Sequence, residues 1–248
     1  MKNGTIRVGI GGWTFEPWRG GVFYPEGLTQ KRELEYASRQ LTSIEINGTY
    51  YSTFKPASLA KWREETPEGF VFAVKASRFC TNRKLLSAAG DSVAKFIGQG
   101  LSELGDRLGP INWQFMETKK FEPEDFEGFL KLLPREVGTL PLRHALEVRN
   151  KSFIDGRFYD LARRYNAAIV FADHDEFPRI DEATADFTYA RLMKTRADVK
   201  TGYKPAQLDA WAKTAKGWAK RGDAFVYLIS GAKERNPAAA KALIERLK

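Results

Sequence analysis

Polar side chains spaced two residues apart stand at the ends of several short apolar segments in this chain of 248 residues. In SIEINGTYY (43–51), Glu45 and Asn47 alternate with isoleucines. Because residues i and i+2 of a strand share one face, each pair would point to the same side of a sheet. The other members of the set are Asn112/Gln114, Glu147/Arg149, Asp173/Asp175, Tyr189/Arg191 and the single Lys75.

Two interpretations of this polar set are open. Ion pairs such as Glu45–Lys75 and Glu147–Arg149 would make it a structural layer inside the protein. Charges are costly to desolvate, however, and a buried ion pair is rarely the cheapest way to stabilise a core. The pattern therefore favours a polar binding pocket over a purely structural layer.

The residue types in the set suggest acid/base chemistry on an anionic compound. Glu45 and Glu147 are the candidate acid and base, with Asp173 as a third catalytic candidate. Glycosidases use two carboxyl groups about 5–10 Å apart in this way. Arginine and lysine suit carboxylate or phosphate groups. We therefore expect a hydrolase or a lyase/isomerase-like enzyme that acts on a small polar, anionic or sugar-like substrate.

A divalent metal ion is an alternative for the same residues. Carboxylates and an imidazole are suitable ligands for such an ion, and the candidate ligands are Glu45, Glu147, Asp173 and His174. The chain has no H-x-H or H-E-x-x-H spacing, however, and no motif for another cofactor. One cysteine, Cys80, excludes an internal disulfide and a cysteine-based zinc site.

Eight strand-like segments alternate with helix-like segments along nearly the whole chain. The predicted strands are 6–10, 43–47, 70–76, 110–115, 144–149, 168–173, 187–193 and 225–229. This alternation predicts a single (β/α)8 barrel domain over 1–248, with a helix-free connection between the sixth and seventh strands. An open doubly wound sheet would place a phosphate-binding glycine loop after the first strand, and GIGGWT does not fit that motif. The polar set would then lie at the carboxyl ends of the strands, where barrel enzymes build active sites.

Positive charge is concentrated in the last part of the chain. The net charge is +9, and residues 194–248 hold 13 basic and 5 acidic residues, which gives +8. Lys213, Lys216 and Lys220 form a stripe beside an apolar helix face. A solvated surface is the ordinary interpretation. The competing function is nucleic-acid binding by this basic region.

The first residues do not resemble a secretory leader, and no run of 18 apolar residues occurs. We therefore expect a cytoplasmic protein with no membrane partner.

The chain resembles the YecE-like family, domain of unknown function 72, in segments that span it from end to end. They include GIGGWTFEPWRGGVFYPEGL (9–28), EINGTYY (45–51), ALEVRN (145–150) and NPAAAKAL (236–243). The resemblance implies a TIM barrel, a cytosolic bacterial setting and a polar pocket, and it implies no known substrate. The positions that match its recurrent polar motifs are Trp13, Glu45, Asn47, Tyr51, Lys75, Gln114, Glu147, Arg149 and Arg191.

Several positions depart from the motifs of this family. Asn82 and Asn150 stand where the family usually has histidine. The R-L-H-G motif of the seventh strand reads Arg191-Leu192-Met193-Lys194, and the F-N-N motif after the eighth reads Ile229-Ser230-Gly231. These losses weaken any mechanism that relies on an imidazole.

Overall fold

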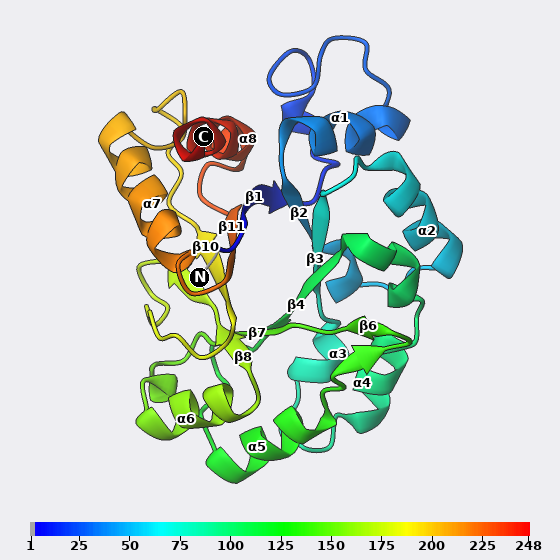
Figure 1. The fold of residues 1–248 in the computed structure, drawn as a ribbon, viewed down its shortest axis with the longest axis vertical. Helices are drawn as coiled ribbons and strands as arrows, with labels where there is room; N and C mark the ends of the chain where they lie inside the picture. The colour runs from blue at the N-terminus through cyan, green and yellow to red at the C-terminus, as the bar shows by residue number, and fades with distance from the viewer. Residues whose placement is uncertain (1–2) are drawn as a thin grey trace.

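Parallel strands enclose the centre of the molecule in the computed structural model, which describes residues 3–248 (Figure 1). Neighbouring strands pair in the order β8-β7-β4-β3-β2-β1-β11-β10-β9, and every pair in this sheet is parallel. The strands are β1 (Ile6–Gly11), β2 (Ser43–Ile46), β3 (Val71–Lys75), β4 (Leu108–Gln114), β7 (His144–Glu147), β8 (Ala167–Ile169), β9 (Phe171–Asp173), β10 (Phe187–Leu192) and β11 (Asp223–Leu228).

The sheet closes on itself through one segment of chain. Strands β8 and β9 stand at the two ends of the strand order, yet only Val170 separates them in sequence. β8 pairs with β7, and β9 pairs with β10. The two strands together occupy the sixth position of an eight-position barrel, which the sequence predicts as the single strand 168–173. The predicted (β/α)8 barrel is confirmed.

Helices surround the barrel on the outside (Figure 1). They are α1 (Glu33–Gln40), α2 (Pro56–Glu65), α3 (Arg78–Thr81), α4 (Gly90–Ile97), α5 (Pro123–Leu132), α6 (Gly156–Arg164), α7 (Pro205–Trp218) and α8 (Asn236–Leu247). Proline stands in the first turn of α2, α5, α7 and α8, where its missing N–H leaves no helical hydrogen bond unmade. A small antiparallel hairpin, β5 (Glu136–Val137) and β6 (Leu140–Pro141), precedes β7.

One expected helix is divided. The pattern of 91–108 predicts a continuous helix, but α4 ends at Ile97 and a 3-10 segment follows at Leu101–Arg107. Gly100 lies between them with a φ of 108°, which interrupts the helix. The expected helix-free connection between Asp173 and Phe187 is confirmed over the described chain.

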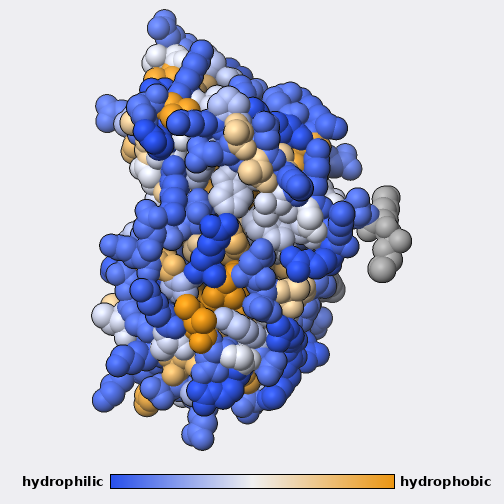
Figure 2. Space-filling view, turned by 90° about the vertical axis from the view of Figure 1, so that its left-hand side faces the viewer, coloured by the Kyte–Doolittle hydropathy of each residue, from blue (hydrophilic) through white to orange (hydrophobic). Residues whose placement is uncertain are grey.

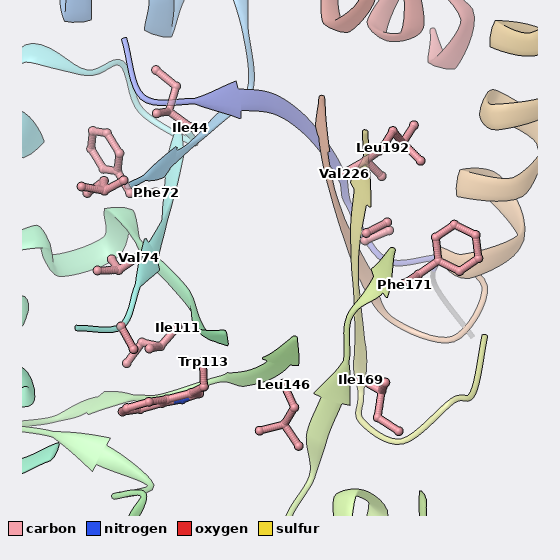
Figure 3. Close-up of a cluster of buried hydrophobic side chains, with 14 of the residues drawn as sticks. Ile44, Phe72, Val74, Ile111, Trp113, Leu146, Ile169, Phe171, Leu192 and Val226 are labelled. Carbon is pink, nitrogen blue, oxygen red and sulfur yellow. The ribbon is translucent and has the colours of Figure 1, made fainter. Parts of the chain in front are cut away.

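Two hydrophobic cores lie on opposite sides of the strands. Ile44, Phe72, Trp113 and Phe171 belong to the outer core, and their side chains point away from the barrel axis toward the helices (Figure 3). A smaller core fills the barrel interior and includes Ala73, Ala145, Val170 and Tyr227. Because the side chains of a strand alternate between faces, each strand contributes to both cores.

Glycine leaves the interior of β1 without side chains at two positions. A Cβ atom on Gly9 would lie 2.0 Å from the carbonyl oxygen of Ser43, and one on Gly11 would lie 2.7 Å from Nδ2 of Asn47. Strand β1 therefore packs closely on β2 and leaves room for polar side chains at the mouth.

Within the described residues, the structure contains no helix with both the length and the apolar character that a membrane span requires.

Candidate functional site

A buried guanidinium joins two carboxylates at the upper end of the barrel interior. Nη1 of Arg191, on β10, donates to both carboxylate oxygens of Glu147, at 2.7 and 2.6 Å. Nη2 of Arg191 donates to Oε1 of Glu45 at 3.1 Å. Both glutamates are completely buried, and Arg191 is 3% exposed. The alternation in SIEIN and HALEVR therefore brings Glu45 and Glu147 together on one cation, from strands that are not neighbours in the sheet.

Neutral side chains complete the hydrogen bonds of these carboxylates. Nδ2 of Asn112, on β4, donates to Glu147 at 2.9 Å and to Glu45 at 3.3 Å. The hydroxyl of Tyr189, on β10, donates to the second oxygen of Glu45. Each buried carboxylate oxygen thus has at least one donor, as a buried charge requires.

Arg149 lies between this network and solvent. Its Nε and Nη2 donate to Oε1 of Glu147 at 3.1 and 2.8 Å, and Nη2 also donates to Gln114 at 2.7 Å. The Arg149 side chain is 21% exposed, whereas Glu147 is not exposed at all. Of the two ion pairs considered for a structural layer, Glu147–Arg149 is present. Glu45–Lys75 is absent, because Arg191 is the ion-pair partner of Glu45.

The charges around Glu147 hold it in its ionised form. Burial alone would raise the pKa of this carboxyl group, but Arg191, Arg149 and Lys75 outweigh that effect and lower the pKa to about 2. In return, the pKa of Arg191 rises because attraction to the glutamates outweighs its burial. A carboxylate with such a low pKa is a weak proton acceptor. Its chemistry suits holding guanidinium groups better than acid/base catalysis.

A cavity of about 450 Å³ opens above the network, at the carboxyl ends of the strands. Glu45 and Glu147 do not line it. The predicted binding residues that do are Trp13, Asn47, Tyr51, Lys75, Arg149 and Arg191. Gln114 is 8% exposed and contacts the cavity indirectly, through its hydrogen bond to Arg149. The structure thus brings six of the predicted binding residues to one opening.

Residues in the segments after two barrel strands, which the polar pattern does not select, also line the cavity. Thr14 follows β1, and Ser230, Lys233 and Asn236 follow β11. Nζ of Lys233 lies 4.0 Å from the centre of the Phe15 ring. No alternation marks these residues, but their positions directly after two barrel strands would have indicated the mouth.

Asp173 lies outside this group, contrary to the expectation that it shares the interior. Ile169 and Phe171 point outward, and Asp173 is the next residue on that face of the strand (Figure 3). Lys194 contacts Asp173 at 3.8 Å and the exposed Asp175 at 2.5 Å.

The candidate metal ligands do not assemble. His174 stacks on Phe177 at a ring separation of 3.8 Å, while Glu45 and Glu147 both bind Arg191. Across residues 3–248, no group of three or more histidine, cysteine, aspartate or glutamate side chains is arranged to hold a metal ion.

Asn82 and Asn150, at positions where the resemblance implies histidine, have structural partners. Nδ2 of Asn82 donates to the hydroxyl of Tyr50 at 3.1 Å. Asn150 accepts a hydrogen bond from the backbone N–H of Ser152 at the start of a short 3-10 helix. Neither residue lines the mouth cavity.

The basic stripe of the sequence lies on a different surface. Lys213, Lys216 and Lys220 line a shallow groove of about 520 Å³ beside α7, together with Arg246 of α8. These lysines lie in and just beyond the second half of α7, which leads to the start of β11, so the groove is on the outside of the barrel and away from the mouth. Figure 2 shows the side of the molecule that carries α7, and its surface is mainly hydrophilic.

A closed eight-position barrel with a polar cluster at the carboxyl ends of its strands defines a TIM-barrel protein with a candidate site at the C-terminal mouth. The model of the family described as "Protein of unknown function DUF72" matches residues 7–248. The chain therefore belongs to the DUF72 family, and the predicted family is confirmed.

Curated relatives of this chain carry family designations. The UPF0759 protein YunF of Bacillus subtilis (strain 168) is 25% identical over 160 residues, which cover 62% of this chain and 54% of YunF. The UPF0759 protein YecE of Escherichia coli (strain K12) is 28% identical over 151 residues, which cover 60% of this chain and 50% of YecE. The matches thus span about half the length of these relatives.

A solved structure supports the fold over the full chain. The crystal structure of a DUF72 family protein from Thermotoga maritima has a TM-score of 0.76 and 23% sequence identity, and the match covers 97% of each chain. At this identity the likeness establishes the fold alone.

The buried network generates a prediction about acid stability. Because folding lowers the pKa of Glu147 from 4.5 to about 2, its stabilising effect is complete above pH 4.5 and disappears as the pH falls through about 2. Glu147→Gln should remove on the order of 3 kcal/mol of this pH-dependent stability. At pH 7 the variant should lose about 3–5 kcal/mol, because Arg191 and Arg149 lose their shared anion.

Urea unfolding at pH 7, 4.5 and 3 measures both effects. Glu103→Gln is the control, because Glu103 is exposed and forms no ion pair with any residue of the described chain. If Glu147→Gln unfolds like this control and keeps the wild-type dependence on pH, the charge of Glu147 does not stabilise the fold.

Proposed function

We propose that the mouth cavity binds a small anionic molecule and that the protein is an enzyme acting on it, of the lyase/isomerase or hydrolase type. The observation that carries this proposal is the separation of charges by depth. Arg149, Arg191 and Lys75 line the cavity, whereas the two glutamates lie beneath it. A ligand that enters the cavity meets cations first.

The charge balance also favours an anion. Arg149, Arg191 and Lys75 line the cavity, and Lys233 adds a fourth basic side chain to its lining, whereas neither Glu45 nor Glu147 reaches it. A guanidinium group presents parallel N–H donors that match a carboxylate or phosphate group. Since the glutamates already hold Arg191 in place, little ordering of that side chain is needed when an anion binds.

The remaining walls suit a hydroxylated compound. Asn47, Ser230 and Asn236 supply amide and hydroxyl groups, and the rings of Trp13 and Tyr51 supply apolar faces. A volume of about 450 Å³ is in the range of small-molecule sites. The combination supports a phosphorylated or carboxylated compound of sugar-like character.

In this proposal the two glutamates position Arg191 and do not transfer protons. Glu147 is ionised, has a low pKa and accepts hydrogen bonds from three side chains. Neither carboxylate lines the cavity. We therefore replace the acid/base pair expected from the sequence with a pair of anions that orient a binding cation.

The proposal predicts binding of simple oxyanions at Arg149. Isothermal titration of the wild type with orthophosphate should show one site per chain. Arg149→Met should weaken this binding about tenfold or more, because a hydrogen bond to a charged group contributes about 1.5–3 kcal/mol.

Arg157→Met is the matched control, because Arg157 is 71% exposed and pairs with Asp155 outside the cavity. This variant should bind orthophosphate like the wild type. Equal affinity in both variants would place the anion elsewhere. If orthophosphate, sulfate and small carboxylates all fail to bind, the proposal is wrong.

The groove beside α7 supports a second candidate, binding of a nucleic acid. Three lysines line it together with Arg246, which forms an ion pair with Asp209 of the same groove at 2.6 Å. A row of lysines can track a phosphate backbone. Replacing Lys213, Lys216 and Lys220 together by glutamine should then weaken binding of a fluorescent single-stranded oligonucleotide and should lower the slope of log affinity against log salt by about 2 to 3.

Three exposed lysines away from the groove provide the control. Changing them to glutamine removes the same formal charge, and the residues are Lys55, Lys61 and Lys131. An equal loss of binding in both triple variants would mean that only the net charge matters. No measurable oligonucleotide binding by the wild type at about 50 mM salt would eliminate this candidate.

A further inference from the structure

Lys75 occupies a distinctive position among the cations of the mouth cavity. It is the last residue of β3, and it pairs in register with Asn112 of the neighbouring strand. The hydroxyl of Thr49 donates to the Lys75 carbonyl oxygen at 2.6 Å, which fixes the backbone at this point. The residue is 9% exposed and lines the cavity, so its amine is desolvated and still faces the ligand space.

Lys75 lacks the counter-ion that a buried ammonium group usually has. Glu45 and Glu147 form their ion pairs with Arg191 and Arg149, and no carboxylate within residues 3–248 forms one with Lys75. Its Nζ atom lies 4.7 Å from the centre of the Tyr50 ring. An ammonium group in this position is destabilised in comparison with one in water.

The surroundings of Lys75 lower the pKa of its amine. Burial and the positive charge of Arg191 lower its pKa to about 8, Arg149 acts in the same direction, and Glu147 and Glu45 oppose the change. At pH 7, an amine with a pKa of about 8 is neutral in about one molecule in ten. An ordinary lysine, with a pKa of about 10.4, is neutral in fewer than about one molecule in a thousand.

We propose that Lys75 is a nucleophile that forms an imine with a small aldehyde or ketone whose carboxylate or phosphate group is bound by Arg149 and Arg191. This inference rests on the proposed anion site and names the substrate class: anionic carbonyl compounds such as 2-oxo acids or open-chain sugar phosphates. A desolvated lysine next to another cationic group is one of the ways in which Schiff-base enzymes activate an amine, because both features increase its neutral fraction.

Imine formation requires only the amine of Lys75 and the carbonyl compound. The lone pair of Nζ attacks the carbonyl carbon, the carbon–oxygen π electrons move to oxygen, and a proton passes from nitrogen to that oxygen. The resulting carbinolamine loses water as the carbon–nitrogen double bond forms. Once protonated, the imine accepts electrons from a neighbouring bond, which permits removal of an adjacent proton or cleavage of a carbon–carbon bond. An imine at Lys75 therefore supports a lyase or isomerase reaction over hydrolysis.

Lys233 provides a comparison within the same cavity. It also lines the wall, and burial lowers its pKa. Its Nζ atom lies over two aromatic rings, those of Phe15 and Trp18, whereas that of Lys75 lies over the single ring of Tyr50. Aromatic rings favour the charged form of a lysine, and this effect is therefore larger for Lys233. No neighbouring cation opposes its protonation in the way that Arg191 opposes that of Lys75. Lys75 should therefore react first.

Reductive trapping with glyoxylate tests the inference on the whole chain. Glyoxylate is an aldehyde with a carboxylate, and cyanoborohydride reduces its imine to a stable carboxymethyl-lysine. Peptide mass spectrometry should locate the first modification at Lys75, at a rate at least about tenfold above that of the exposed Lys213, and the rate should rise between pH 6 and pH 8. Lys75→Arg, which keeps a cation but cannot form an imine, should lose this fast modification.

The outcomes separate this inference from the proposed function. Orthophosphate binding together with modification of Lys75 no faster than Lys213 overturns the imine step and leaves the anion site intact. Fast modification of Lys75 without orthophosphate binding supports the reactive amine and contradicts the anion site. Fast modification that persists at another lysine in Lys75→Arg also overturns the assignment, because the reactive amine would then be a different one.

Discussion

The arrangement of the mouth depends on one buried interaction, the guanidinium of Arg191 shared between Glu45 and Glu147. Removing any one of these charges would leave the others desolvated and uncompensated, and such a loss costs several kcal/mol. Each oxygen of the two carboxylates accepts a hydrogen bond, from Arg191 or from the neutral donors Asn112 and Tyr189. The position of Arg191 is therefore fixed before any ligand arrives.

The barrel geometry explains how these groups meet. Glu45, Glu147 and Arg191 come from β2, β7 and β10, which are distant in sequence and are not paired with one another. In a closed barrel, side chains at similar heights on different strands converge on the axis. Gly9 and Gly11 on β1 contribute by taking up no side-chain volume on the interior face. The same closure gives the network its burial, because the aliphatic and aromatic interior lies below it.

The sequence predicts the barrel and most of the mouth because both follow from alternation. Alternation around Glu45 and Glu147 places the polar residues of each strand on one face, and the predicted parallel barrel indicates that this face is the interior. The segment AIVFAD (168–173) is apolar on both faces, so its pattern does not say which face points into the barrel. Phe171 points outward (Figure 3), and Asp173 lies two residues further along the same strand, on the same face. The Glu45–Lys75 ion pair of the structural-layer alternative does not form, because Glu45 pairs with Arg191, a residue 146 positions away in sequence.

The depth of each charge could not be predicted from residue types. Glu147 and Arg149 are two residues apart on one face, yet the first is fully buried and the second lies at the opening. This difference decides between a pair of catalytic acids and a cationic binding site. The depth of each side chain below the mouth depends on where β7 ends relative to the neighbouring strands. No local pattern in a single sequence specifies this position.

The most direct test of the cationic mouth is a crystal structure of the protein soaked with selenate, with the anion located by anomalous diffraction from selenium. We expect a selenate in the mouth cavity, within hydrogen-bonding distance of Arg149 and Arg191. A cavity that stays without selenate while the groove beside α7 binds it would contradict the account.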